Sequence, residues 1–180
     1  MSKISVACIV LNDKKEIFIA KRNPVGDMGD RWEFPGGKIE YGESDKVSII
    51  REMQEEFGVD VIVHEKITEG SFFHKEKKVS LHAYRVEFLA DGIKTPFKLT
   101  EHSDYKWVDI EEIKNLNFVD SDLSIYDDVK KYISSSFNNY LISQNENKEP
   151  IKNLITNYVG EEKLNSYLNN MDNTEMNDTQ

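Results

Sequence analysis

The spacing of apolar and polar residues along this chain predicts an α+β fold. Short segments rich in β-branched and aromatic residues indicate strands, and they lie at residues 4–11, 17–20, 32–34, 59–63, 70–73, 79–89 and 104–108. We expect the first two strands to form a hairpin, because residues 12–15 read NDKK and favour a turn. Strands and helices do not alternate regularly, which favours a mixed sheet with helices packed on it.

Helical periodicity appears in the segments between and after these strands. A helix is predicted from Ser44 or Asp45, either of which can cap its start, to Gly58, which can end it. Its expected core-facing stripe consists of Val47, Ile50, Met53 and Phe57. A short helix is expected at residues 109–114. A last helix is predicted to begin at Asp120 or Ser121, with an apolar stripe made of Leu123, Tyr126, Val129 and Ile133.

The composition of the chain changes near residue 134. We expect a folded domain over residues 1–134, followed at 135–180 by an acidic extension rich in Asn and Ser. An apolar pattern at 151–168 predicts one or two amphipathic helices in that extension. Residues 169–180 carry too few apolar side chains to support a core, and we expect them to be disordered.

Charge and cysteine content exclude several classes of protein. The 180 residues include 33 Asp and Glu against 23 Lys and Arg, a net charge of −10, whereas a protein that grips a nucleic-acid polymer presents a basic face. The single cysteine, Cys8, excludes an internal disulfide framework and a Cys-rich zinc site. No apolar segment reaches the length of a membrane span. We therefore expect a soluble, cytoplasmic protein with neither a nucleic-acid polymer nor a membrane as partner, and its oligomeric state stays open.

Three glutamates on the first predicted helix are the first candidates for chemistry. Glu52, Glu55 and Glu56 are spaced i, i+3 and i+4, so they share one helix face, which we expect to point away from the apolar stripe. Neighbouring like charges destabilise a helix, and a divalent cation would offset that repulsion. Mg²⁺ prefers oxygen ligands and bridges carboxylates to phosphates, so it would also let an acidic protein bind a phosphorylated substrate. For the glutamates alone, a solvated acidic face is the alternative.

A wider pattern of residues around these glutamates follows a fixed spacing. In chain order it consists of Gly37, five residues, Glu43, seven residues, Arg51-Glu52-Met53, one residue, Glu55-Glu56, one residue and Gly58-Val59. All nine positions match, and the pattern resembles the Nudix box, with Met53 and Val59 in its two aliphatic places. The segments at 17–22 and 32–40 are similar to the MutT-like branch of that family. The resemblance covers about residues 3–133.

The resemblance implies a fold and an activity. The fold would be an α/β/α sandwich of the α+β type, with a mixed sheet and the box as a loop–helix–loop. The activity would be Mg²⁺-dependent hydrolysis, with Mn²⁺ as a substitute, of a nucleoside triphosphate to a monophosphate and pyrophosphate. Oxidised nucleotides such as 8-oxo-dGTP are substrates in that branch. The alternatives are hydrolysis of ADP-ribose or of a dinucleoside polyphosphate, and a nucleotide-binding regulatory module without turnover.

The same resemblance implies roles for residues in and beside the box. Carbonyl groups of Gly36 or Gly37 would join Glu52, Glu55, Glu56 and Glu101 as metal ligands. Glu52, Glu55, Glu101 and Arg51 would form the catalytic set, in which the resemblance leaves open which carboxylate is the general base. Arg51 would pair with a box carboxylate, Glu43 in the first place, and hold the glutamates. Gly37, Glu43 and Gly58 would be structural. His102, beside Glu101, receives no role.

Three residues outside the helix match positions that contact the nucleotide in MutT-like enzymes. Lys38 would touch the phosphate chain, and Arg22 would reach the nucleotide from the end of its strand. Asp122 would read the base, the alternative being an ordinary acidic residue in the first turn of a helix. Because an ionised Asp only accepts hydrogen bonds, it would favour guanine or cytosine over uracil and thymine, which present a carbonyl where cytosine has an amine.

Overall fold

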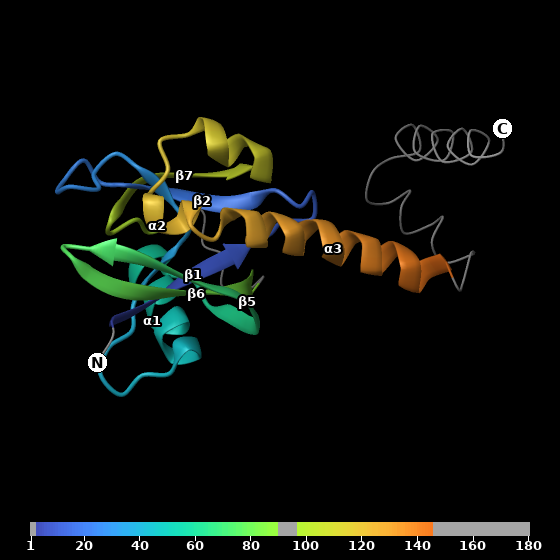
Figure 1. The fold of residues 1–180 in the computed structure, drawn as a ribbon, viewed down its shortest axis with the longest axis horizontal. Coiled ribbons are helices and arrows are strands. Elements are labelled where there is room, and N and C mark those ends of the chain that lie inside the picture. Colours follow the sequence, from blue (N-terminus) through green and yellow to red (C-terminus); the bar gives the residue numbers. More distant parts are fainter. Residues whose placement is uncertain (1–2, 90–96, 146–180) are drawn as a thin grey trace. The chain divides into compact units, whose positions relative to one another are not determined.

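The computed structural model describes residues 3–89 and 97–145, whose strands form two sheets flanked by helices (Figure 1). In chain order the elements are β1 (Lys3–Val10), β2 (Ile17–Arg22), β3 (Trp32–Glu33), β4 (Gly36–Lys38), α1 (Asp45–Phe57), β5 (Val61–His74), β6 (Lys77–Phe88), β7 (His102–Val108), the 3₁₀ helix η2 (Ile110–Asn115), α2 (Asp120–Leu123) and α3 (Tyr126–Asn145).

The larger sheet is mixed, as the sequence predicts. It has four strands in the order β4–β1–β6–β5, with β1 parallel to β6 and antiparallel to β4. The smaller sheet has three antiparallel strands in the order β3–β2–β7. Helices α1 and α3 pack on opposite faces of β1, since its alternate side chains join different clusters. The predicted α+β sandwich is therefore confirmed.

The expected hairpin of the first two strands is wrong. The turn forms, and the Asn12 side-chain oxygen accepts hydrogen bonds from the N–H groups of Lys14 and Glu16. A bridge between Leu11 and Ile17 joins the two segments, but β1 and β2 then enter different sheets. Each strand already has a partner on both edges, so its backbone groups are satisfied without the other strand.

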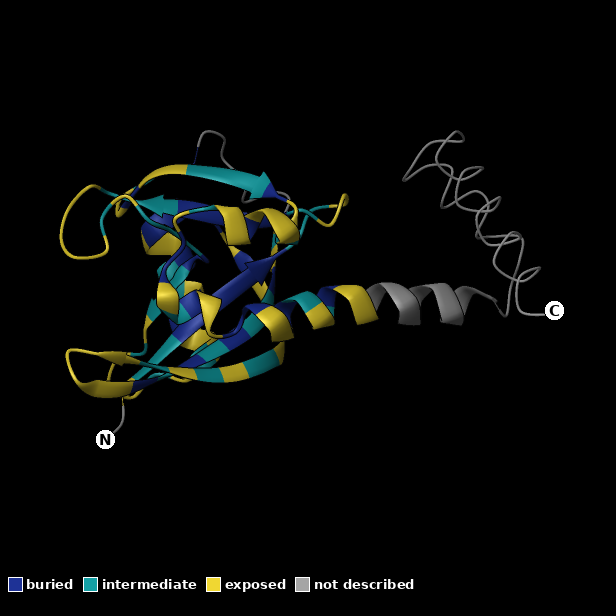
Figure 2. Ribbon diagram, turned by 45° about the horizontal axis from the view of Figure 1, so that its top comes forward, coloured by how far each residue is buried: buried dark blue, intermediate teal, exposed yellow. Residues whose placement is uncertain are grey.

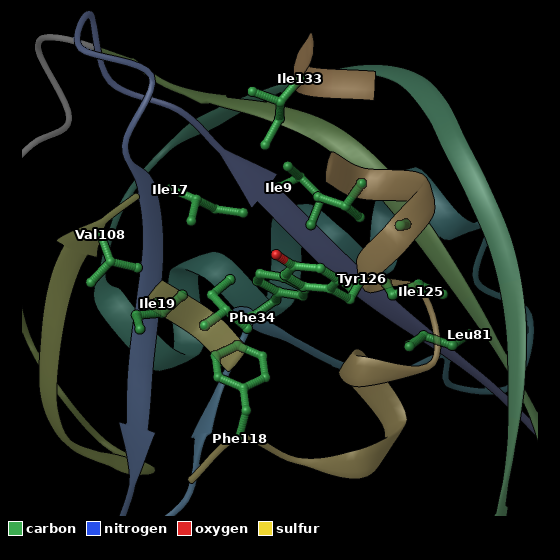
Figure 3. Close-up of a cluster of buried hydrophobic side chains, with 14 residues drawn as sticks. Ile9, Ile17, Ile19, Phe34, Leu81, Val108, Phe118, Ile125, Tyr126 and Ile133 are labelled. Carbon is green, nitrogen blue, oxygen red and sulfur yellow. The ribbon is translucent and has the colours of Figure 1, made fainter. Parts of the chain in front are cut away.

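The two hydrophobic clusters lie on either side of β1 and β2, which are the most deeply buried strands (Figure 2). One cluster joins Ala7 and Ile9 of β1 to Tyr126, Val129 and Ile133 of α3, and Figure 3 shows this group around Phe34 and Phe118. The other cluster joins the remaining β1 side chains to α1 and contains Val6, Cys8, Val10, Ile49, Met53 and Phe57. The candidate site is built on the α1 side.

Helix α1 has the predicted ends but not the predicted inner face. The Ser44 side chain accepts a hydrogen bond from the N–H of Val47, and Gly58 ends the helix in a left-handed conformation, φ 67°. Val47 and Ile50 are 53% and 45% exposed. The buried residues are Ser48, Ile49, Met53, Glu56 and Phe57. The correction matters for chemistry, because Glu56 lies on the inner face and not on a solvated one.

Two further predicted elements differ in the structure. The strands expected at 59–63 and 70–73 are one strand, β5, whose pairing with β6 is irregular near Lys66. The predicted last helix is two helices, since it is interrupted after α2 and continues as α3 from Tyr126. Leu123, at the end of α2, is 40% exposed and does not share a buried stripe with Tyr126. The segment between them approaches β5 so closely that a Cβ on Gly70 would lie 2.6 Å from Ile125. The interruption between α2 and α3 therefore coincides with close packing against Gly70, which the periodicity of apolar residues does not reveal.

The chain divides into compact units at residues 1–134 and 135–180, and the second is described only to residue 145, where α3 ends. The helices expected at 151–168 and the disorder expected at 169–180 lie outside the described residues. Within the described part, no helix is both long and apolar enough to span a membrane.

Candidate active site

Arg51 is the hub of the candidate site. Its Nε and Nη2 donate to Glu43 at 2.7 and 2.9 Å, and its Nη1 lies 3.0 Å from carboxylate oxygens of both Glu52 and Glu55. Nη2 also donates to the backbone carbonyl of Lys38 at 3.1 Å. These bonds lower the pKa of Glu43 to about 2, chiefly through the hydrogen bond from Arg51. A planar guanidinium with five donors can serve several acceptors at once.

The segment Gly36-Gly37 passes close to helix α1 and strand β1 because neither residue carries a side chain. A Cβ on Gly37 would lie 2.3 Å from the Glu52 carboxylate, and a Cβ on Gly36 would lie 2.1 Å from the backbone oxygen of Val6. Gly36 also has φ 145°, a conformation that L side chains rarely adopt. The backbone of Gly37 therefore lies directly against the carboxylate of Glu52.

Glu56 is the most unusual ionisable group of the site. The residue is 4% exposed and accepts a hydrogen bond from the N–H of Gly36, while its Oε2 is buried without a hydrogen-bond partner. Burial in the first place, together with the negative charges of Glu33, Glu52 and Glu101, raises its pKa to about 9. Burial is also the first cause of a raised pKa at Glu52. A buried carboxylate of this kind requires either a proton or a cation.

The residues present fit a divalent cation. The orphaned oxygen of Glu56 and the adjacent Glu52 carboxylate are oxygen donors, which Mg²⁺ prefers. Among the described residues, no group of three or more His, Cys, Asp or Glu side chains is arranged to hold a metal ion as the side chains stand. Glu52 and Glu55 are instead turned toward the Arg51 guanidinium. A cation at Glu56 would therefore have to draw on these carboxylates together with backbone carbonyls.

The structure brings Glu101 and Arg22 together, next to the carboxylates. They line a hollow of about 240 Å³ with Asn23, Val25 and Thr100. Glu101 raises the pKa of both Glu52 and Glu56, which places it within their electrostatic reach. Arg22, however, is not a free cation, because its Nη1 donates to both oxygens of Glu33 at 2.8 and 2.9 Å.

Lys38 lies in different surroundings. Its exposed side chain lines a second hollow of about 570 Å³, which also contains Lys3, Ile39 and Tyr41. The structure gives the Lys38 side chain no contact with the candidate carboxylates. Its backbone carbonyl, in contrast, accepts hydrogen bonds from Arg51 and from Ser48.

Asp122 occupies a buried position beside the site. It accepts hydrogen bonds from the Phe34 N–H at 2.7 Å and from the Ser121 hydroxyl at 3.1 Å. Burial raises its pKa to about 7, and the negative charge of Glu33 adds to the rise. The carboxyl group is therefore divided between its two protonation states near neutral pH, and the base preference expected of an ionised Asp belongs to the ionised fraction alone.

Two contributing residues are missing from the sequence-based set. Glu33 contacts Arg22 and His102, and its charge raises the pKa of Glu56 and of Asp122. His102 is buried, with 1% of its side chain exposed. Glu33 falls within the segment that resembles MutT-like proteins, but the sequence does not show that Glu33 contacts Arg22 and His102. Sequence spacing offers no signal for the burial of His102.

The sequence model of the NUDIX domain family matches residues 1–129. An 8-oxo-dGTP diphosphatase of Escherichia coli (strain K12) is 45% identical over 60 residues, which are 33% of this chain and 46% of that protein. In that alignment the chain thus spans about half of the relative's length. A CTP pyrophosphohydrolase of the same organism is 26% identical over 69% of this chain and 90% of that protein.

Solved structures agree with the sequence comparisons. The crystal structure of a MutT protein from Methanosarcina mazei Go1 covers 75% of this chain and 95% of its own, with a TM-score of 0.62 and 26% sequence identity. The fold and the glutamate-bearing loop–helix–loop therefore define a protein of the NUDIX class. The chain belongs to the NUDIX domain family, and its relatives include MutT-like proteins.

Proposed function

We propose that this protein is a Mg²⁺-dependent, MutT-like pyrophosphohydrolase of nucleoside triphosphates, which releases a nucleoside monophosphate and pyrophosphate. The observation that carries the proposal is the buried carboxylate of Glu56, with an unpaired oxygen and a pKa raised to about 9. Such a group fits a cation site. The names of the relatives, an 8-oxo-dGTP diphosphatase and a CTP pyrophosphohydrolase, support a nucleotide as the substrate.

The chain's own residues divide the work as follows. Glu52, Glu55, Glu56 and Glu101 would hold the cation together with a carbonyl of Gly36 or Gly37, and Arg51 would keep Glu52 and Glu55, which it contacts, in place. The bound cation neutralises phosphate oxygens and lowers the pKa of water. Glu52, Glu55 or Glu101 accepts the proton of the attacking water. The water oxygen bonds to a phosphorus of the chain, and the opposite P–O bond breaks to release the other product.

The substrate contacts are part of the same proposal. Arg22 and Glu101 line a hollow beside the carboxylates, so the nucleotide would be bound next to the glutamate face. Lys38 would have to reorient toward the phosphates, because its side chain lines the other hollow. Asp122 would read the base and favour guanine or cytosine, oxidised forms included. A substrate of this kind belongs to the nucleotide pool, which supports the cytoplasm as the enzyme's location.

A substrate panel with the full chain tests the proposal. Purified protein with Mg²⁺ is given the common and 8-oxo-substituted triphosphates, ADP-ribose and a dinucleoside tetraphosphate, and the released phosphate species are identified. Pyrophosphate and a monophosphate from a triphosphate are the expected products. Turnover of ADP-ribose or the dinucleotide alone would move the enzyme to another substrate class. Binding of nucleotides without any turnover would identify a regulatory module.

A further inference from the structure

One buried residue is connected to each of the three segments that carry the candidate cation ligands, once through the chain itself and twice through its side chain. His102 directly follows Glu101. Its Nε2 donates to the Glu33 carboxylate at 2.9 Å, and Glu33 lies just before the Gly36-Gly37 segment. Its ring stacks on Phe57, the last residue of α1, with the centroids 5.2 Å apart and the planes at 17°. His102 thus links the Glu101 segment, the glycine segment and the glutamate helix.

An irregularity in the smaller sheet places His102 in this position. Lys21 of β2 lies opposite Asp104 of β7, so a regular antiparallel register would put Ser103 opposite Arg22. Instead the register shifts, and His102 lies opposite Arg22. A bulge of this kind redirects a side chain and is common near active sites. Here it brings the imidazole into the interior, where Arg22 holds the same Glu33 carboxylate from another side.

Glu101 itself is exposed, and the hydrogen bonds around it involve mainly the backbone. Its carbonyl accepts from the Asn23 N–H at 3.0 Å, and the Thr100 hydroxyl donates to the backbone carbonyl of Glu55 at 2.9 Å. These contacts fix where the chain runs. The side-chain bond from His102 to Glu33 ties the Glu101 segment to Glu33, one of the carboxylates whose charge raises the pKa of Glu56.

We propose that His102 is a positioning residue of this enzyme, which sets Glu101 against Glu56 through its bond to Glu33 and its stack on Phe57. The inference rests on the proposed function, because it assigns His102 to the same cation site. Removal of an outer residue that orients metal ligands typically lowers metal affinity or activity by ~10–100-fold. The bond to Glu33 is the part that a substitution can isolate from the packing.

The test compares two substitutions of His102 in the full chain with the wild type. His102→Met fills a similar volume without an N–H, whereas His102→Gln carries an N–H near the place of Nε2. Mn²⁺ binding to the free enzyme is measured by electron paramagnetic resonance, together with kcat and KM on the best triphosphate. For His102→Met we expect Mn²⁺ affinity and kcat to fall by ~10-fold or more with KM nearly unchanged, and for His102→Gln a loss within ~3-fold.

A matched control comes from a second His–Glu pair of this chain. His64 contacts Glu87 at 3.0 Å on the surface of the larger sheet, so His64→Met removes a bond of the same kind outside the candidate site. It should leave Mn²⁺ affinity and kcat at the wild-type level. The proposal is overturned if His102→Met also keeps both, or if a folded His102→Gln loses as much as His102→Met.

Two further outcomes are a His102→Met variant that does not fold and a wild type without turnover. If His102→Met fails to fold, His102→Gln is compared with His102→Asn, whose shorter amide stops short of Glu33, and equal Mn²⁺ affinities of these two overturn the proposal. If the wild type hydrolyses none of the triphosphates, the proposed function fails. The Mn²⁺ titration still decides the positioning role, and a wild type that does not bind Mn²⁺ overturns it.

Discussion

Arg51 holds Glu43 with two nitrogen atoms, Nε at 2.7 Å from one carboxylate oxygen and Nη2 at 2.9 Å from the other. The third nitrogen, Nη1, contacts Glu52 and Glu55 at 3.0 Å. The pair therefore anchors the guanidinium so that it can hold two candidate ligands at once. Glu43, in the loop before the helix, is tied further by accepting from the Glu40 N–H at 2.9 Å.

Arg51→Lys should retain the positive charge and lose this arrangement. An ammonium group is a point charge that cannot make the parallel bonds to Glu43 and reach Glu52 as well. We expect kcat to fall by ~10–100-fold, the range typical for groups that orient metal ligands. Steady-state kinetics at saturating Mg²⁺ measure the effect, and a thermal melt shows whether the variant is folded. Wild-type kcat in a folded Arg51→Lys would contradict the anchoring role.

The two adjacent glycines should respond differently to alanine. In Gly37→Ala the new methyl group would meet the far end of the Glu52 side chain, 2.3 Å away, which can move aside. The protein should fold while losing activity, because Glu52 is displaced. In Gly36→Ala the methyl group would meet the Val6 backbone at 2.1 Å, at φ 145°. That strain should lower Tm strongly. Melts and activity of the two variants side by side check the contrast, and equal losses of Tm would contradict it.

The capped helix could be predicted from local signals, and the mixed sheet from the irregular order of strands and helices along the chain. Ser44 and Gly58 mark the two ends of α1 by their own conformational preferences. The inner face of α1 could not be predicted in the same way, since Ser48 and Glu56 are buried by hydrogen bonds to the Gly36–Lys38 segment. A pattern of apolar residues contains no information on polar groups that are buried by a partner distant in sequence.

The candidate site shows the same division. The spacing from Gly37 to Val59 identified the residues around Arg51, because the box lies on one continuous loop and helix. Glu33 and His102 come from β3 and β7 and meet only after the β2–β7 register has shifted. The pairing of strands and the bulge are tertiary features, and His102 was for that reason assigned no role from the sequence.

Glu56 predicts a pH-dependent stability of the metal-free enzyme. Its pKa in the folded state, about 9, is above the ordinary value of 4.5. Between these values the unfolded chain releases a proton that the folded state retains, so the free energy of unfolding decreases as the pH rises. Below about pH 4.5 both states are protonated and this loss is absent. Thermal melts with a chelator should show Tm falling from about pH 5 to about pH 9, and Mg²⁺ should oppose the fall by replacing the proton.

Glu56→Gln separates this effect from activity. The amide keeps the size of the side chain and removes its titration, so the metal-free variant should lose the part of the pH dependence that Glu56 contributes. Activity should fall by at least ~100-fold, a barrier increase of roughly 3 kcal/mol. Glu55→Gln, whose side chain is more exposed, should lose activity to a similar degree without the change in metal-free stability. Near-wild-type turnover in either variant would contradict its assignment as a ligand.

Asp122 predicts a base preference that depends on pH. The ionised carboxylate only accepts hydrogen bonds, which suits the amine of cytosine and the N–H groups of guanine. The protonated form also donates, and can therefore serve the carbonyl groups of uracil and thymine. Because its pKa is raised to about 7, the ionised form dominates above that pH. The preference for guanine or cytosine triphosphates over UTP and dTTP should be strong near about pH 8 and weaker near about pH 6.

Two substitutions of Asp122 test this assignment, and a substitution of the neighbouring Asp120 serves as the control. Asp122→Asn retains an acceptor for the Phe34 N–H and does not titrate, so it should remove the pH dependence of the preference. Asp122→Ala should slow the favoured nucleotides, by ~1–3 kcal/mol per lost contact, and leave UTP and dTTP nearly unchanged. Asp120→Ala removes an exposed carboxylate that pairs with Arg31 at 3.0 Å, and should leave the preference intact. If the wild type hydrolyses UTP as fast as CTP and GTP at about pH 8, or if Asp122→Ala slows all nucleotides equally, Asp122 does not read the base.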